Sequence, residues 1–145
     1  WCAVLVGDYG TGKTMLACCA LQERVGRFWE YGHLCRHLRQ LMFTRGLDEL
    51  EAIRSWQESD SLLVLDDVGA ESIDREGKLT AWAQGTLFAI LHARYKAKLP
   101  TIVTTNTPSA LDARIVDRYG WTICSGQSVR ELMRQGRYQR RQKGA

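Results

Sequence analysis

The sequence predicts an α/β fold in which helices cover both faces of a parallel β-sheet, and two observations support this. Short apolar runs with little polar alternation recur at Cys2–Val6 and Leu62–Leu65, and Pro100–Asn106 is a third predicted strand, rich in β-branched residues. Parallel strands covered on both faces show this pattern. Segments with helical spacing of apolar residues separate the runs, and strands that alternate with helices favour a parallel sheet in a layered domain.

The remaining elements follow from the same periodicities. Helices are expected over Lys13–Arg24, His33–Phe43, Leu47–Trp56, Thr80–Lys96 and Pro108–Arg118. Further strands are expected at Arg27–Tyr31 and Trp121–Cys124. In the run at Pro100–Asn106 the proline stands only at the entry, where it does not interrupt the pairing of the strand.

Length and composition limit the class of protein. The 145 residues suit one compact domain, and 45% hydrophobic with 25% charged residues is typical of a soluble globular protein. No apolar run is long enough to cross a bilayer and no signal peptide is recognisable, so we expect a cytoplasmic protein without a membrane partner. The chain begins at Trp1, directly on the first strand, and we interpret it as a piece from which upstream sequence is missing.

The cysteines do not indicate a metal site. They are Cys2, Cys18, Cys19, Cys35 and Cys124. Their number is odd and none forms a CxxC pair, so neither a zinc site nor a disulfide framework is expected. Separate thiols in a reducing compartment are the interpretation that fits.

A glycine-rich motif follows the first strand. It reads Gly7-x-x-x-x-Gly12-Lys13-Thr14 and leads into a helix, the context in which this pattern is a phosphate-binding loop, or P-loop. Backbone N–H groups and the positive end of the helix would bind phosphate oxygens. Lys13 is expected on the β- and γ-phosphates of ATP, and the Thr14 hydroxyl on Mg²⁺. The predicted ATP-binding residues are Gly7, Asp8, Tyr9, Gly10, Thr11, Gly12, Lys13 and Thr14.

Two acidic residues follow the buried strand Leu62–Leu65, at the end of a strand where α/β proteins bind ligands. We assign Asp66 to the magnesium ion, directly or through water, together with Thr14. We assign Asp67 to the attacking water. Glu71 is a second candidate for the base, and the sequence leaves both open.

Asn106 ends the third of these predicted strands. If this strand lies beside the one that carries Asp66, the amide reaches the same crevice and can position the water or contact the γ-phosphate. An asparagine before Thr107-Pro108 is equally suited to cap a helix or a turn. The spacing leaves both interpretations open.

The net charge of +4 is concentrated at the C-terminus. The basic residues of this segment are Arg130, Arg134, Arg137, Arg140, Arg141 and Lys143, against the single acid Glu131. Such a tail can attract nucleic acid phosphates, and a solvated C-terminal helix fits equally well.

Several motifs together resemble one known family. Leu62–Glu71 strongly resembles the Walker B segment of the DnaC/IstB group of AAA+ ATPases. Arg94-Tyr95 with Pro100–Asn106, then Asp117-Arg118, then Gly126–Arg130 resemble later elements of that group, in the same order. The resemblance implies a P-loop NTPase three-layer sandwich, with an AAA+ core at residues 1–130 that has no full helical lid and a basic tail at 131–145.

The resemblance also implies roles for individual residues. Asn106 would be the sensor 1 residue. Arg118 would be an arginine finger that reaches the ATP of a neighbouring subunit, although a surface arginine on an amphipathic helix is the alternative. Arg130 would be the sensor 2 arginine at the nucleotide, or simply part of the tail. Asp67 stands where many AAA+ proteins have glutamate, which agrees with the DnaC/IstB group and leaves slow hydrolysis open.

The function implied by the resemblance is an ATPase of DNA replication similar to DnaC-type helicase loaders, with ATP-dependent binding of single-stranded DNA and self-association through Arg118. A replicative helicase would be its partner. The alternative is an IstB-type transposition helper that acts on duplex DNA with a transposase. A small-molecule P-loop kinase and a module that binds ATP without hydrolysing it remain as other classes.

Overall fold

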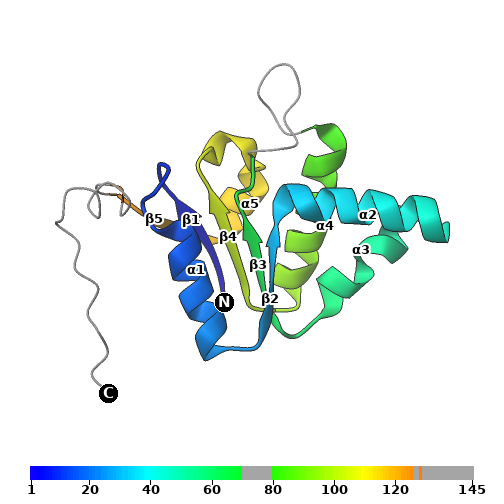
Figure 1. The fold of residues 1–145 in the computed structure, drawn as a ribbon, viewed down its shortest axis with the longest axis horizontal. Helices are drawn as coiled ribbons and strands as arrows, with labels where there is room; N and C mark the ends of the chain where they lie inside the picture. Colours follow the sequence, from blue (N-terminus) through cyan, green and yellow to red (C-terminus); the bar gives the residue numbers. More distant parts are fainter. Residues whose placement is uncertain (70–79, 126–127, 129–145) are drawn as a thin grey trace.

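The structure is a computed structural model that describes residues 1–69, 80–125 and 128 (Figure 1). Its strands are β1 (Cys2–Val6), β2 (Gly26–Glu30), β3 (Leu62–Asp66), β4 (Thr101–Thr105) and β5 (Gly120–Ile123). Its helices are α1 (Lys13–Glu23), α2 (Tyr31–Arg45), α3 (Glu49–Glu58), α4 (Ala81–Lys96) and α5 (Ala113–Arg118), with a 3₁₀ turn, η1, at Pro108–Ala110.

The strands form one parallel sheet in the order β2-β3-β4-β1-β5. Every residue of β3 and β4 is buried, because these strands lie inside the sheet with neighbours on both sides. The strand β5 lies at an edge, and all its residues are exposed. The predicted α/β fold with a parallel sheet is confirmed.

Helices cover the two faces of the sheet unequally (Figure 1). On one face α1 packs over a small apolar cluster that includes Leu5, Ala17 and Val64. On the other face α2, α3 and α4 enclose the larger cluster, which includes Leu34, Ile53 and Ile90. The result is the predicted three-layer sandwich, whose core lies mainly on the side of α2, α3 and α4.

Several predicted ends differ from the structure by one or two residues, and two of the predictions are corrected with a physical reason. Tyr31 is not the end of the second strand but the first residue of α2, and its hydroxyl donates to the carbonyl of Ala83. The helix expected over Pro108–Arg118 is divided into η1 and α5. The division occurs because the Asp112 carboxylate accepts from the backbone N–H of Arg114 at 2.8 Å and so starts a new helix.

No helix of the described residues is long and apolar enough to span a membrane. All five cysteines are free thiols, of which Cys35 is buried while Cys18 and Cys19 are exposed on α1. The described residues hold no group of three or more His, Cys, Asp or Glu side chains that could together bind a metal ion.

One fully buried arginine joins four elements at the amino-terminal ends of β3 and β4. The side chain of Arg94, on α4, has no exposed surface, and each of its five N–H bonds has an acceptor within 2.9 Å. The acceptors are the Thr101 hydroxyl and the carbonyls of Trp56, Ser59, Ser61 and Pro100. Because all five donors are used, the buried charge is stabilised by oriented dipoles.

We predict that Arg94→Lys lowers the free energy of unfolding by about 3 kcal/mol, because lysine has three donors for five acceptors and a buried polar group without a partner costs about 1–3 kcal/mol. Urea unfolding of the two proteins measures the difference. The matched control is Arg45→Lys at the exposed end of α2, where a change within about 0.5 kcal/mol is expected. A loss below about 1 kcal/mol for Arg94→Lys would contradict the role of the five hydrogen bonds.

Candidate nucleotide-binding site

The glycine-rich loop connects β1 to α1 at the carboxyl edge, by which we mean the edge of the sheet where β1, β2, β3 and β4 end. Gly10 and Gly12 have φ values of 79° and 92°, in the left-handed region that favours glycine. A Cβ atom on Gly7 would lie 2.1 Å from the carbonyl oxygen of Cys124, and one on Gly10 would lie 2.3 Å from the Ser128 hydroxyl. The loop therefore requires glycine for its conformation and for its close contacts with the segment after β5.

Lys13 starts α1 and closes back over this loop. Its side chain is 7% exposed, and Nζ donates to the carbonyls of Gly7 and Asp8, each at 2.8 Å. An ammonium group has three donors, so one remains for an oxygen beside the loop. The geometry fits a lysine that is fixed by the loop and presents its charge to a phosphate.

Thr14, Asp66 and Thr104 form a chain of hydrogen bonds at the same edge. The Thr14 hydroxyl donates to the carboxylate of Asp66, at 3.0 Å from Oδ1 and 3.1 Å from Oδ2. The Thr104 hydroxyl donates to Asp66 Oδ1 at 2.6 Å. Neighbouring oxygen ligands of an octahedral magnesium ion lie about 2.9 Å apart, so the hydroxyl of Thr14 and the carboxylate of Asp66 fit a shared Mg²⁺ site.

Asp67 and Asn106 contact each other beside this group. Asn106 Nδ2 donates to Asp67 Oδ1 at 3.0 Å, and this assigns the amide orientation because a carboxylate only accepts. Asn106 Oδ1 is buried and has no hydrogen-bond partner among the described residues. The structure thus brings Asn106 into the crevice with Asp67. The cap of η1 falls instead on Thr107, whose side chain makes no capping bond.

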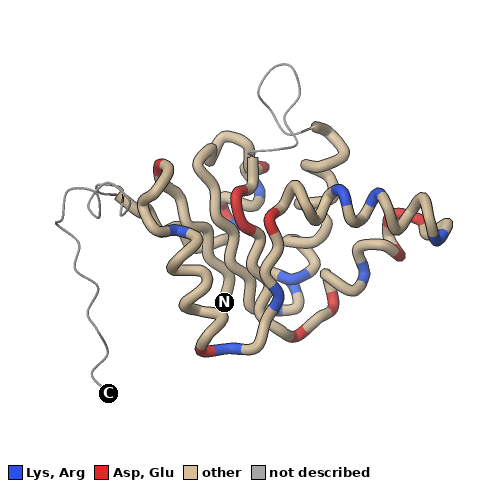
Figure 2. Tube along the Cα trace, in the orientation of Figure 1, with Lys and Arg blue, Asp and Glu red and all other residues tan. Residues whose placement is uncertain are grey.

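These side chains line one pocket of about 500 Å³. The described residues that line it are Tyr9, Gly10, Gly12, Lys13, Thr14, Met15, Glu30, Asp66, Asp67, Thr104 and Asn106. Figure 2 shows acidic segments side by side at the carboxyl ends of β2 and β3, where Glu30 is paired in register with Asp66. The pocket has the volume and the polar groups of a small-molecule site.

Sequence reasoning missed three lining residues, Glu30, Met15 and Thr104. The signal for Glu30 was its place at the end of a predicted strand, but the predicted boundary at Tyr31 moved the end of that strand by one residue. Thr104 was included in a β-branched strand and not considered as a polar group. Glu71 and Arg130, the alternative base and the expected sensor 2 residue, lie outside the described residues.

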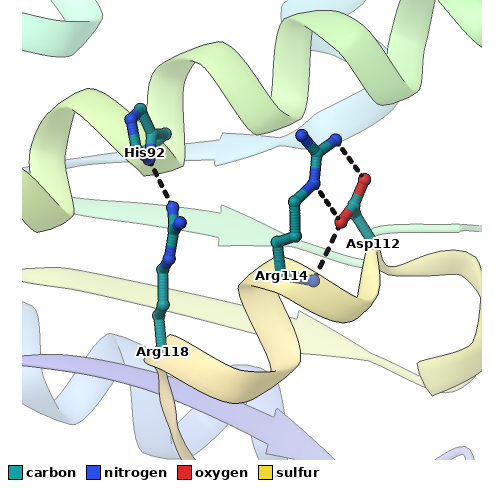
Figure 3. A network of polar contacts seen from close by, with 4 residues as sticks. All are labelled: His92, Asp112, Arg114 and Arg118. Carbon is teal, nitrogen blue, oxygen red and sulfur yellow. Dashed lines mark hydrogen bonds and ion pairs between the residues drawn. The ribbon is translucent and has the colours of Figure 1, made fainter.

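Arg118 lies elsewhere. Figure 3 shows it pointing from the last turn of α5 toward α4, where Nη1 contacts Nδ1 of His92. The His92 ring stacks on Phe88 at 5.3 Å between ring centroids, and the guanidinium of Arg114 lies 3.8 Å from the centroid of Phe88. Arg114 is also paired with Asp112 at 2.7 Å. Arg118 does not line the pocket.

The fold and the pocket define the class of protein as a P-loop NTPase. Residues 2–117 match the family model described as IstB-like ATP binding protein. This match spans most of the chain, so the chain belongs to that family, and it is an ATP-binding protein of the DnaC/IstB type of AAA+ ATPases. The resemblance of its motifs to that group is confirmed.

Solved structures agree with this assignment. The crystal structure of the DnaC helicase loader is 26% identical, with a TM-score of 0.68 over 85% of this chain and 77% of that one. The crystal structure of DnaI is 23% identical, with a TM-score of 0.63 over 85% of this chain and 72% of that one. AMPPCP-bound DnaA from Aquifex aeolicus is 17% identical, with a TM-score of 0.65 over 96% of this chain but 47% of that one, so it shows the fold alone. No curated protein matches the chain by sequence.

We predict a pH-dependent contact between His92 and Arg118. Burial, followed by the charges of Arg118, Lys96 and Arg114, holds the pKa of His92 below its usual value. The neutral ring accepts the hydrogen bond of Arg118, so the stability that this contact contributes is complete above the usual pKa of about 6.5 and is lost as the pH falls through the lowered pKa. In an NMR titration, Arg118→Gln is expected to raise the pKa of His92.

Lys96→Gln is the control, because its charge acts on the same ring with a smaller effect. It is expected to raise the pKa of His92 less than Arg118→Gln does. Equal shifts in both variants, or none, would show that the contact in Figure 3 does not determine the titration of His92.

Proposed function

We propose that residues 1–130 form the core of an AAA+ ATPase that binds and hydrolyses Mg²⁺-ATP and acts on DNA in replication, as a loader of a replicative helicase in the cytoplasm. The observation that carries the proposal is the convergence of Lys13, Thr14 and Asp66 with Asp67 and Asn106 in one pocket. A phosphate, a metal ion and a water molecule each have suitable groups there. A kinase would also need an acceptor site, and no feature of the described residues favours one.

In this proposal each group of pocket residues has a separate role. The loop N–H groups and the free donor of Lys13 bind the β- and γ-phosphates. Thr14 and Asp66 hold the magnesium ion, which neutralises charge on the phosphate oxygens when it is bound. Asp67 accepts a hydrogen bond from the attacking water and takes that proton as the water oxygen bonds to phosphorus, while Asn106 Oδ1 accepts a hydrogen bond from the other O–H, which gives the buried Oδ1 atom its partner. Two acceptors on a water molecule fix its oxygen toward the phosphorus atom.

A neighbouring subunit supplies the last charge in this proposal. Arg118 does not line the pocket of its own chain, and its contact with His92 lies on α4. The family resemblance, in which this arginine acts on the nucleotide of a neighbouring subunit, supports a role on a second copy. Hydrolysis then depends on self-association, and a dilute monomer hydrolyses ATP slowly. We retain Arg130 and Glu71 in this proposal as a second nucleotide contact and as the alternative base.

The test is complementation between two inactive variants. Lys13→Ala loses ATP binding but keeps Arg118, whereas Arg118→Ala binds ATP but cannot complete the site of a neighbour. Lys13→Ala alone is expected to be inactive because it does not bind ATP. Arg118→Ala alone is expected to lose about a thousandfold in ATP turnover, because arginine fingers contribute about that much or more. A mixture of the two is expected to regain activity, measured as ADP release.

Three controls make the result specific. Arg114→Ala, one turn earlier on α5, should keep most of the activity. Lys13→Ala mixed with the double variant Lys13→Ala/Arg118→Ala should stay inactive. Asp67→Asn should bind ATP as the unchanged protein does and turn it over about a hundredfold more slowly. If the unchanged protein releases ADP no faster than Asp67→Asn does, the protein is a module that binds ATP without hydrolysing it. If the mixture of Lys13→Ala with Arg118→Ala does not regain activity, the arginine finger in trans is excluded.

The DNA substrate separates the loader from the transposition helper. The likeness to the DnaC helicase loader supports a loader, and the fold shared with DnaA, which is solved with AMPPCP and single-stranded DNA, supports a single-stranded substrate. The alternative that the resemblance to the IstB-like family implies is a helper of a transposase on duplex DNA. We favour the loader because the DnaC structure covers most of both chains.

We predict that AMPPCP with Mg²⁺ raises the affinity for single-stranded DNA on the order of tenfold over ADP, a usual size for coupling between two sites. Fluorescence anisotropy with labelled single-stranded and duplex oligonucleotides of one sequence measures this. Affinity should fall steeply with salt, because phosphate contacts release counterions. A nucleotide effect confined to duplex DNA would support the transposition helper instead.

A further inference from the structure

A buried threonine hydroxyl in the pocket contacts the carboxylate of Asp66 and the backbone of Asp67. Thr104 is the fourth residue of β4, and its side chain is 1% exposed. Its hydroxyl donates to Oδ1 of Asp66 at 2.6 Å and accepts from the backbone N–H of Asp67 at 2.9 Å. A hydroxyl has one donor, so these two bonds fix the direction of its hydrogen atom toward Asp66.

The bond to Asp66 determines which carboxylate oxygen is available. Oδ1 receives both the Thr104 hydroxyl and the Thr14 hydroxyl, at 2.6 and 3.0 Å. Among the described residues, Oδ2 receives only the longer contact from Thr14, at 3.1 Å. Thr104 therefore holds the Asp66 carboxylate in one orientation, in which Oδ2 is the oxygen available to a cation or to its water ligands.

The bond to Asp67 determines the backbone of the second carboxylate. Asp67 has a φ of 55°, a left-handed conformation that non-glycine residues rarely adopt. The Thr104 hydroxyl accepts from its N–H, and the Thr104 carbonyl accepts from the N–H of Val68 at 2.9 Å. These bonds hold the turn in which Asp67 Oδ1 meets the Asn106 amide at 3.0 Å.

We propose that Thr104 is a positioning residue. Its hydroxyl orients both Asp66, the carboxylate proposed to bind Mg²⁺, and Asp67, the carboxylate proposed to bind the attacking water. This inference rests on the proposed function, because it assumes that Mg²⁺-ATP occupies the pocket. Thr104 does not contact the phosphates in the proposed arrangement. It acts through Asp66 and Asp67, so its loss weakens the response to magnesium and leaves the binding of metal-free ATP intact.

The adjacent residue provides a matched control. The Thr105 hydroxyl is also buried and also bonds within the turn, donating to the carbonyl of Val68 at 2.7 Å and accepting from the N–H of Thr107 at 2.9 Å. Among the described residues it makes no hydrogen bond to the carboxylate of Asp66 or Asp67, and it does not line the pocket. Thr105→Val and Thr104→Val therefore remove the same group from neighbouring positions, and only one of the two hydroxyls contacts Asp66.

The experiment measures ATP affinity by calorimetry, in Mg²⁺ and in EDTA. The ratio of the two affinities reports the magnesium contribution without any need for hydrolysis. We expect Thr104→Val to lower this ratio about tenfold, the usual effect of losing a group that orients a metal ligand, with affinity in EDTA changed by less than about twofold. Thr104→Ser, which keeps the hydroxyl, should retain the ratio of the unchanged protein, and so should Thr105→Val.

Turnover gives the second readout. Thr104→Val should need more Mg²⁺ for half-maximal ADP release and should keep a lower maximal rate at saturating Mg²⁺, because Asp67 also loses its support. Thr104→Ser should restore both values. If Thr104→Val does not fold, Thr104→Cys replaces it, since a thiol is a weaker donor and should give a ratio between those of the valine and serine variants.

The outcomes separate the two proposals. If Mg²⁺ does not change the ATP affinity of the unchanged protein, the proposed function fails before any variant is made. If the unchanged protein responds to Mg²⁺ and Thr104→Val responds equally, the positioning role of Thr104 is overturned while the ATPase proposal stands. An equal loss in Thr105→Val, or no rescue by Thr104→Ser, overturns it as well.

Discussion

The structure depends on the alignment of β3 with β4, which is held at both ends by side-chain hydrogen bonds. At the amino-terminal ends, the buried guanidinium of Arg94 donates to the carbonyls of Ser61 and Pro100, which precede the two strands. At the carboxyl ends, Thr104 bonds to Asp66 and to the backbone of Asp67. A parallel pair that slipped by one residue would turn each side chain to the opposite face. These bonds therefore keep the carboxylates of β3 and the polar groups of β4 on the same side.

The strand β1 pairs with β4 on the side opposite to β3. The P-loop that follows β1 therefore lies beside the polar groups at the ends of β3 and β4. Val6 is paired in register with Thr105, so the loop after β1 begins level with the end of β4. This places the Thr14 hydroxyl within 3.1 Å of both oxygens of Asp66, although 52 residues separate the two in sequence. The pocket is thus a product of strand order, since three loops that are distant in sequence open at one edge of the sheet.

The sequence predicts those features that repeat with a period or follow a fixed spacing. The buried strands, the glycine-rich loop and the acidic pair Asp66-Asp67 are of this kind, because a strand covered on both faces must be apolar throughout. It does not predict the role of Thr104. Threonine is common in strands because of its β-propensity, and only the pairing of β4 with β3 determines whether its hydroxyl reaches a carboxylate. The break at Asp112 is hidden for a similar reason, because an aspartate within a helical pattern starts a new helix only where its carboxylate reaches a free N–H.

Lys13 places positive charge on one side of the pocket that we propose for phosphoryl transfer. Lys13, Asp66 and Asn106 all reach the pocket from the carboxyl edge, and each is buried or held by neighbouring groups. Arg118, which the family resemblance relates to catalysis, lies on α5 and contacts the neutral ring of His92 on α4. A transition state that spreads charge over the phosphate oxygens needs positive groups on more than one side. Lys13 is the one cation that lines the pocket among the described residues, and the arginine finger that we propose from a second copy would supply positive charge from another side.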